Sequence, residues 1–172
     1  RMMRRYSPYI DPYIRMIKEN KVEHCKEQDL MIDNLVIPVL ERDDVIINNE
    51  KIEKGLSLQK YFPYQLIAWE IFLFALIVGV ETADGDIYFN DIRIMVGRGS
   101  GKNGFISFLC FYFMSPYHGI RGYNIDLMAN SETQAKTSFK DVYEIITDPI
   151  DQKYEKVLKK NYHATKELIT GK

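Results

Sequence analysis

Residues 95–104 read MVGRGSGKNG, and this stretch decides how the rest of the chain is interpreted. The run before it, at 87–96, is rich in β-branched and aromatic residues, which predicts a strand. The run after it, at 105–114, predicts a helix, so residues 97–104 form a glycine-rich loop between the two. Such a loop directs unpaired backbone N–H groups and the positive end of a helix at an anion. Lys102 stands where the lysine of a phosphate-binding loop reaches the β- and γ-phosphates of a nucleotide.

The loop departs from the standard phosphate-binding pattern at two positions. Val96 occupies the position of the pattern's first glycine, although the next residue is Gly97. The serine or threonine that ligates Mg²⁺ is replaced by Asn103, whose amide oxygen is a weaker ligand for that ion. Asn103 is therefore the candidate metal ligand. The candidate nucleotide-binding residues of the loop are Gly97, Arg98, Gly99, Ser100, Gly101, Lys102, Asn103 and Gly104.

Two other interpretations of the loop stay open. Gly99, Gly101 and Gly104 spell the GxGxxG pattern of dinucleotide-binding folds, and Asp126 follows at a distance suited to a ribose-binding acid. Against this, about ninety residues precede the strand with which such folds usually begin, and Lys102 is unusual in a turn that binds pyrophosphate through backbone alone. The third interpretation is a glycine-rich turn without a ligand.

The segments after the loop predict an α/β fold. Residues 123–128 and 164–170 predict two further strands, and residues 131–146 and 150–161 predict two helices. Ser131 caps the first of these helices, with a glutamine three residues on, as in a capping box. The alternation of strand, helix and strand predicts a P-loop-type parallel sheet with flanking helices.

The segments before the loop predict helices. Asp11-Pro12 predicts the start of one that ends near Asn20, because proline is favoured in the first turn. A second helix is expected at 23–40, shortened or kinked by Pro38. The residues expected to face inward on it are Leu30, Met31 and Leu35.

An apolar helix is expected from Pro63 to Val78, with Gly79 at its end. Residues 1–60 therefore form a helical N-terminal arm, and 61–172 the domain that carries the loop.

Composition excludes several classes of protein. The chain has 172 residues, of which 46% are hydrophobic and 27% charged, so a disordered tail is excluded. The net charge of −1 excludes a nucleic-acid binder held by global charge alone. Two cysteines fit a reducing compartment, and they and the three histidines show no metal-ligand spacing. The longest apolar run, 66–80, contains Glu70 and is too short for a membrane span, so a cytoplasmic protein without membrane contact is expected.

The loop resembles the deviant Walker A motif of tailed-phage terminase large subunits, the ATPase motors that package viral DNA. Asn103 fits this resemblance, because that family often has asparagine or aspartate where other loops have serine or threonine. The segment FPYQ at 62–65 resembles the family's adenine-binding segment, the residues 128–135 its next strand and helix, and residues 13–26 its helical leader.

The resemblance implies ATP and Mg²⁺ as cofactors, and Lys102 and Arg98 as the catalytic pair, with Arg98 either a finger on the transferring phosphoryl group or a structural partner. It implies that Tyr64 and Gln65 contact adenine. In a full protein the partners would be double-stranded DNA, the portal and the small terminase subunit, in a motor assembled in the host cytoplasm, with a separate nuclease domain.

Residues 61–172 match only the front half of the ATPase domain, without an apolar strand ending in Asp-Glu, so the chain alone is expected to be inactive. The alternatives are a non-hydrolysing module that binds nucleotide or a partner, and a fragment of a dinucleotide-binding oxidoreductase.

Overall fold

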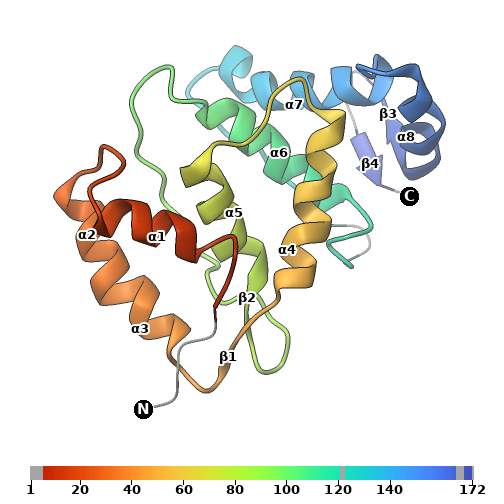
Figure 1. Cartoon of the computed structure of the whole chain (residues 1–172). Helices are drawn as coiled ribbons and strands as arrows, with labels where there is room; N and C mark the ends of the chain where they lie inside the picture. The colour runs from red at the N-terminus through yellow and green to blue at the C-terminus, as the bar shows by residue number, and fades with distance from the viewer. Residues whose placement is uncertain (1–5, 121–122, 166–168, 172) are drawn as a thin grey trace. The chain divides into compact units, whose positions relative to one another are not determined.

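The computed structural model describes residues 6–120, 123–165 and 169–171, and these are mainly helical (Figure 1). The chain divides into two compact units, and each is built from two separate pieces of sequence. The first unit comprises Arg1–Glu53 and Ile67–Ile94, and the second comprises Lys54–Leu66 and Met95–Lys172. The candidate loop and the 62–65 segment therefore belong to the same unit.

The first unit opens with helix α1, Asp11–Lys18, which begins where the Asp11-Pro12 pair predicted. Its buried side chains are Tyr13, Ile14 and Ile17. Asn20, just beyond the helix, has a positive φ of 52°, a conformation that asparagine tolerates better than most residues. The predicted start and approximate end of this helix are confirmed.

The second predicted helix is present as three consecutive helical segments. They are α2 (Lys26–Met31), the π-helical turn η1 (Ile32–Val36) and α3 (Ile37–Leu40). Pro38 lacks the N–H that an α-helix would use for its backbone hydrogen bond. The wider π turn ends at Val36, two residues before the proline, and the helix then continues through Pro38 to Leu40.

The predicted inward face of this helix is wrong for Leu30 and Leu35, and Met31 is only half-buried. Leu30 and Leu35 are each 47% exposed, whereas Ile32 and Val36 are buried. Because apolar residues occur on both faces of this segment, the sequence did not identify the buried one.

A small sheet and an apolar helix complete the first unit. Strands β1 (Val45–Ile47) and β2 (Val80–Thr82) pair antiparallel. Helix α4 spans Asn49–Leu56, of which residues 49–53 belong to this unit and residues 54–56 to the second, and α5 spans Ala68–Gly79. Helix α5 begins at Ala68 rather than at Pro63 as predicted, because the Glu70 carboxylate accepts the Ile67 N–H at 2.9 Å and closes the helix start there. Among the residues in the described ranges, no helix is long and apolar enough to cross a membrane.

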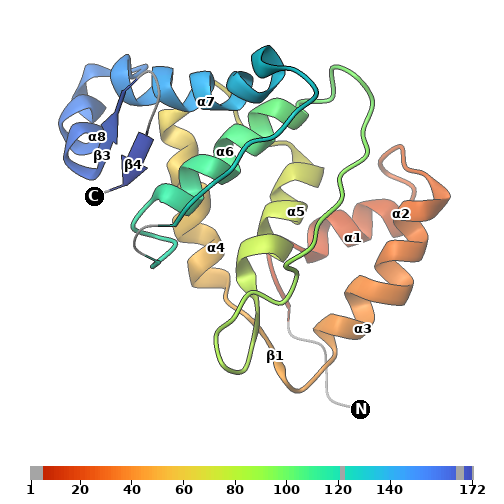
Figure 2. The same ribbon diagram turned by 180° about the vertical axis from the view of Figure 1, so that it is seen from behind.

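The second unit contains the candidate loop and, among its described residues, four helical segments of at least five residues that lie wholly within it. They are the 3₁₀ segment η2 (Ser57–Tyr61), α6 (Lys102–Met114), α7 (Glu132–Thr147) and α8 (Glu155–Asn161), with a short 3₁₀ turn, η3 (Gln152–Tyr154), before α8. Helix α7 packs on α6 (Figures 1 and 2). Ser131 caps α7, because its hydroxyl accepts the Gln134 N–H at 3.3 Å. The predicted helices at 105–114, 131–146 and 150–161 are confirmed.

Aromatic side chains form the core of the second unit. Phe62 lies edge-on to Phe108 and Phe111, with ring centroids 5.2 and 5.4 Å apart. Tyr61 and Tyr162 contact the same Phe111 ring. The short segment 54–66 is therefore held to α6 by ring packing, which places residues 62–65 beside that helix.

The predicted parallel sheet is wrong. The described residues form two antiparallel sheets of two strands each, β1–β2 and, in the second unit, β3 (Tyr162–Ala164) with β4 (Ile169–Gly171). Residues 87–96 and 123–128 are not strands, apart from an isolated bridge between Glu81 and Ile87. A β-branched composition favours extended backbone, but a strand also needs a neighbour for its ladder of hydrogen bonds.

The third predicted strand, 164–170, is replaced by the turn and edges of the β3–β4 hairpin, with 166–168 outside the described residues. Residues 121–122 of the loop expected around 119–122 also lie outside them.

Candidate functional site

The glycine-rich loop leads directly into helix α6. Gly101 is the N-cap of this helix with φ +88° and ψ −3°, the left-handed conformation, and Lys102 is the first helical residue. Gly99 also has a positive φ, of 84°. Residues that carry a side chain rarely adopt this backbone conformation, so the loop needs glycine at both positions.

The loop presents backbone donors at the positive end of the helix. Phe105 N–H donates to the Gly101 carbonyl at 3.1 Å, and this bond closes the first helical turn. By helix geometry, the N–H groups of residues 102–104 have no acceptor within the helix itself. A left-handed residue followed by a helical one, here Gly101 and Lys102, turns successive N–H groups toward one side, where they bind anions.

The side chains of the loop add positive charge. Arg98, Lys102 and Asn103 are exposed to solvent, and residues 95–104 contain no acidic side chain. The Ser100 hydroxyl oxygen is buried and has no hydrogen-bond partner within the part of the chain that the structure describes. Two cations, a polar amide and a hydroxyl donor, all between residues 98 and 103, are groups suited to an anion rather than to an apolar ligand.

The structure brings Tyr64 to the first turn of α6. The Tyr64 hydroxyl donates to the Gly104 carbonyl oxygen at 2.9 Å, although the two residues are 40 apart in sequence. A methyl group at Gly104 would lie 3.1 Å from the end of the Tyr64 ring, so glycine permits this close approach.

Gln65 is exposed next to Tyr64. The Leu66 N–H donates to the Gln59 side chain at 2.8 Å, which fixes the segment. Tyr64 and Gln65 do not start a helix, contrary to the prediction, but their segment lies beside the helix that carries the loop.

A polar cluster behind the loop was not found from the sequence. Ser107 lies fully buried among apolar residues of α6, with its hydroxyl oxygen 2.8 Å from the Asn103 carbonyl oxygen and 2.9 Å from Oδ2 of Asp141 on α7. The buried Ser138 hydroxyl, also on α7, donates to the same carbonyl at 3.5 Å. The available signal was a serine in an otherwise apolar helix, because a buried hydroxyl requires a partner.

The residues of the competing interpretations are not assembled into a site. Asp126 is exposed on a segment that is not a strand, so it does not lie at the sheet edge that a ribose-binding acid requires. His24 lies beside Asp29 at 3.1 Å, and the buried His118 packs against Phe113 and Tyr123. Across residues 6–120, 123–165 and 169–171, no three His, Cys, Asp or Glu side chains are grouped to hold a metal ion.

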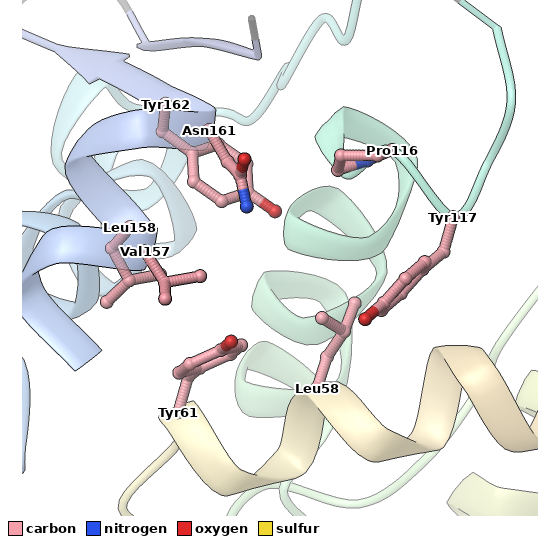
Figure 3. A pocket seen from close by; sticks show the side chains of 8 residues that line it. All are labelled: Leu58, Tyr61, Pro116, Tyr117, Val157, Leu158, Asn161 and Tyr162. Atoms are coloured by element: carbon pink, nitrogen blue, oxygen red, sulfur yellow. The ribbon is translucent and has the colours of Figure 1, made fainter. Parts of the chain in front are cut away.

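A small cavity lies elsewhere in the second unit, between η2, the C-terminal end of α6 and α8 (Figure 3). Its volume is about 70 Å³. The lining side chains are Leu58, Tyr61, Pro116, Tyr117, Val157, Leu158, Asn161 and Tyr162. Pockets for cofactors have volumes of roughly 300 Å³ and above, so this cavity is too small for a nucleotide.

Comparison with known proteins adds no further constraint on the site. No protein-family model, curated protein or solved structure matches this chain.

Proposed function

We propose that the loop 97–104 binds the phosphate groups of ATP. The observation that carries this proposal is the entry of the loop into α6, where Gly101 in the left-handed conformation places Lys102 at the first helical position. The positive helix end, the Lys102 ammonium group and the available Ser100 hydroxyl would all act on the same anion. Anion binding of this kind depends on the loop and the helix, so it does not need a parallel sheet, which the described residues do not form.

In this proposal Tyr64 and Gln65 contact the adenine ring. The hydrogen bond between Tyr64 and Gly104 supports it, because it holds this segment beside the first turn of α6. A glutamine side chain has both a donor and an acceptor, which match the N6 amine and N7 of adenine. Because Gln65 is exposed, its amide is accessible to a base.

Mg²⁺ enters the proposal as the counter-ion of ATP. The exposed Asn103 amide supplies one oxygen ligand near the phosphates, and Arg98 contacts the terminal phosphate. The resemblance to terminase large subunits supports a wider role, in which ATP hydrolysis drives DNA packaging together with double-stranded DNA, a portal and a small subunit.

The proposal is tested by titrating the 172-residue chain with MgATP in a calorimeter. We expect Lys102→Ala to weaken binding at least about tenfold, since a charged contact to phosphate is worth about 1.5–3 kcal/mol. The matched control is Lys140→Ala, which removes an exposed lysine of α7 that pairs with Glu144. Equal affinity of the unmutated chain and Lys102→Ala would contradict the loop assignment, and preference for NAD over ATP would favour a dinucleotide site.

A further inference from the structure

The polar cluster between α6 and α7 lies at the end of the candidate loop. The Ser107 hydroxyl oxygen is 2.8 Å from the Asn103 carbonyl oxygen and 2.9 Å from Oδ2 of Asp141. Ser107 is fully buried, and Asp141 is half-buried on α7. The Asn103 carbonyl belongs to the first turn of α6, so the cluster connects α7 to the residues that would contact phosphate.

The hydroxyl proton of Ser107 has two acceptors within reach and can be donated to only one at a time. A carboxylate is the stronger acceptor of the two, because its hydrogen bond is charge-assisted. A serine that donates instead to the carbonyl four residues earlier tends to bend its helix. Asp141 therefore competes with Asn103 for this proton and opposes a bend in the first turn of α6.

Asp141 is not needed to bury α7, since this helix has a separate apolar face. Val142, Ile145 and Ile146 are buried on it. A half-buried carboxylate also loses hydration, which opposes folding unless the group finds hydrogen-bond donors. The hydrogen bond from Ser107 to Asp141 is therefore better explained by an effect on the first turn of α6 than by a contribution of Asp141 to the buried face of α7.

We propose that Asp141 is a positioning residue for phosphate binding. By accepting the hydrogen bond from the Ser107 hydroxyl, it fixes the first turn of α6, and with it the N–H groups of residues 102–104 and the start of the Lys102 side chain. The inference rests on the proposed function, because it names what holds that same site. It requires Asp141 to act through Ser107 and not by direct contact with the ligand.

The experiment measures MgATP affinity by calorimetry at a temperature at which circular dichroism shows each variant folded. We expect Asp141→Ala to weaken binding about three- to tenfold, as for the loss of one hydrogen bond. Asp141→Asn keeps an acceptor oxygen at the same position and should recover most of the affinity. Glu144→Ala is the control, because Glu144 is an exposed carboxylate less than one turn further along α7.

A double-mutant cycle tests the path of the effect. Ser107→Ala should weaken binding by itself, and adding Asp141→Ala to it should change the affinity no further. The amide signals of Gly104 and Ser107 in ¹H–¹⁵N spectra without ligand should shift in Asp141→Ala and keep their positions in Glu144→Ala. A role limited to stability would lower the melting temperature and leave the affinity of the folded protein unchanged.

Unchanged affinity in Asp141→Ala, or additive losses in the double variant, would overturn the inference while the proposed function stands. If Asp141→Ala does not fold, an unchanged affinity in Ser107→Ala has the same meaning. Absence of MgATP binding by the unmutated chain would overturn the proposed function and this inference with it.

Discussion

The Tyr64 hydroxyl donates a hydrogen bond of 2.9 Å to the Gly104 carbonyl, and a side chain at Gly104 would meet the same tyrosine ring at 3.1 Å. The two residues are therefore complementary, because the glycine leaves the space that the ring needs to reach the carbonyl. Phe62 stabilises the arrangement, since its ring packs edge-on against Tyr64 with centroids 5.4 Å apart. The contact between the 62–65 segment and α6 depends on both members of the pair.

Replacing Gly104 with alanine should help the protein only when Tyr64 is also replaced. Alanine is favoured over glycine in a helix by about 1 kcal/mol, but here the new methyl group pushes the Tyr64 ring from its hydrogen bond, which costs about the same. We expect the free energy of unfolding of Gly104→Ala to be unchanged or lower. In a Tyr64→Ala background, the same substitution should raise it by about 1 kcal/mol. Urea unfolding of the four chains measures both effects, and equal effects in both backgrounds would show that the ring and the glycine are independent.

Gln65→Ala should reduce the preference for ATP over GTP. Guanine has O6 where adenine has its amine, so a glutamine that pairs with adenine meets a mismatch in GTP. The unmutated chain should favour ATP by about 1–3 kcal/mol, the value of a bidentate contact to a base. Calorimetry with both nucleotides measures the ratio. Gln59→Ala is not a suitable control, because Gln59 holds Leu66, so the exposed Gln152 serves instead. Equal affinity for ATP and GTP in the unmutated chain would argue against an adenine contact.

Glu70→Gln should stabilise the protein at neutral pH. Burial raises the pKa of Glu70 above its ordinary value of 4.5, and the hydrogen bond from Ile67 N–H opposes this with a smaller effect. The folded state therefore binds the Glu70 proton more tightly than the unfolded state does. The protonated carboxyl stabilises the unmutated protein fully below the pKa of the unfolded state, and this stabilisation is lost as pH rises through the pKa of the folded state. Glutamine keeps the acceptor for Ile67 without the charge.

The measurement is the free energy of unfolding of both chains at several pH values from 4 to 8. The advantage of Glu70→Gln should grow with pH over the range in which the buried carboxyl ionises. Glu41→Gln, at an exposed glutamate after α3, is measured in parallel as the control substitution. A constant difference between Glu70→Gln and the unmutated chain would mean that Glu70 ionises alike in the folded and unfolded states.

The two cysteines should react at very different rates with thiol reagents. Cys25 is exposed, whereas Cys110 is buried on α6, where burial raises its pKa to about 11. The thiolate is the reactive form, so Cys110 is protected twice, by low access and by low ionisation. Native protein at pH 8 should lose one thiol rapidly to Ellman's reagent, and Cys25→Ser should abolish that phase. Both thiols should react in denaturant, and rapid loss of both in the native protein would contradict the buried position of Cys110.

Gly79→Ala should destabilise the first unit. A methyl group at this position would lie 2.2 Å from Cγ1 and 2.3 Å from Cδ1 of Ile52, which is fully buried. Overpacking of this kind costs about 1–3 kcal/mol, more than the gain of about 1 kcal/mol from alanine in a helix. Gly97→Ala is the control for stability, because among the described residues no atom beyond its two chain neighbours lies within 4 Å of its added methyl group. Thermal unfolding measures the loss, and Gly79→Ala should cost less when it is added to Ile52→Ala than when it is added to the unmutated chain.

The helices that the sequence predicted correctly have local start signals. Pro12 at the start of α1 and Ser131 before α7 act on the backbone of their own first turn, so the sequence alone identifies them. The start of α5 was predicted at Pro63 because proline is favoured in the first turn of a helix. The true start depends on Glu70, which accepts the Ile67 N–H, but in the sequence Glu70 is a single charge within an apolar run and does not indicate a helix start.

The parts that failed depend on partners distant in sequence. Residues 87–96 and 123–128 have the composition of strands, but a strand forms only where another segment completes its hydrogen bonds. At the candidate site, the loop and its helix were predictable because they are contiguous. The Ser107–Asp141 contact was not, since it joins residues 34 apart and depends on how α6 and α7 pack.

Because pieces of the two units alternate along the chain, part of the second unit is synthesised before the first unit is complete. Phe62 leaves the ribosome 46 residues before Phe108, the ring that it packs against. At about 5–20 residues per second, the 54–66 segment has to wait on the order of seconds for α6, while residues of the first unit are added between them. Because each unit contains two separate pieces of sequence, no single cut of the polypeptide yields an intact unit, and a fragment that starts at Met95 would lack the Phe62 ring that packs on Phe108 and Phe111.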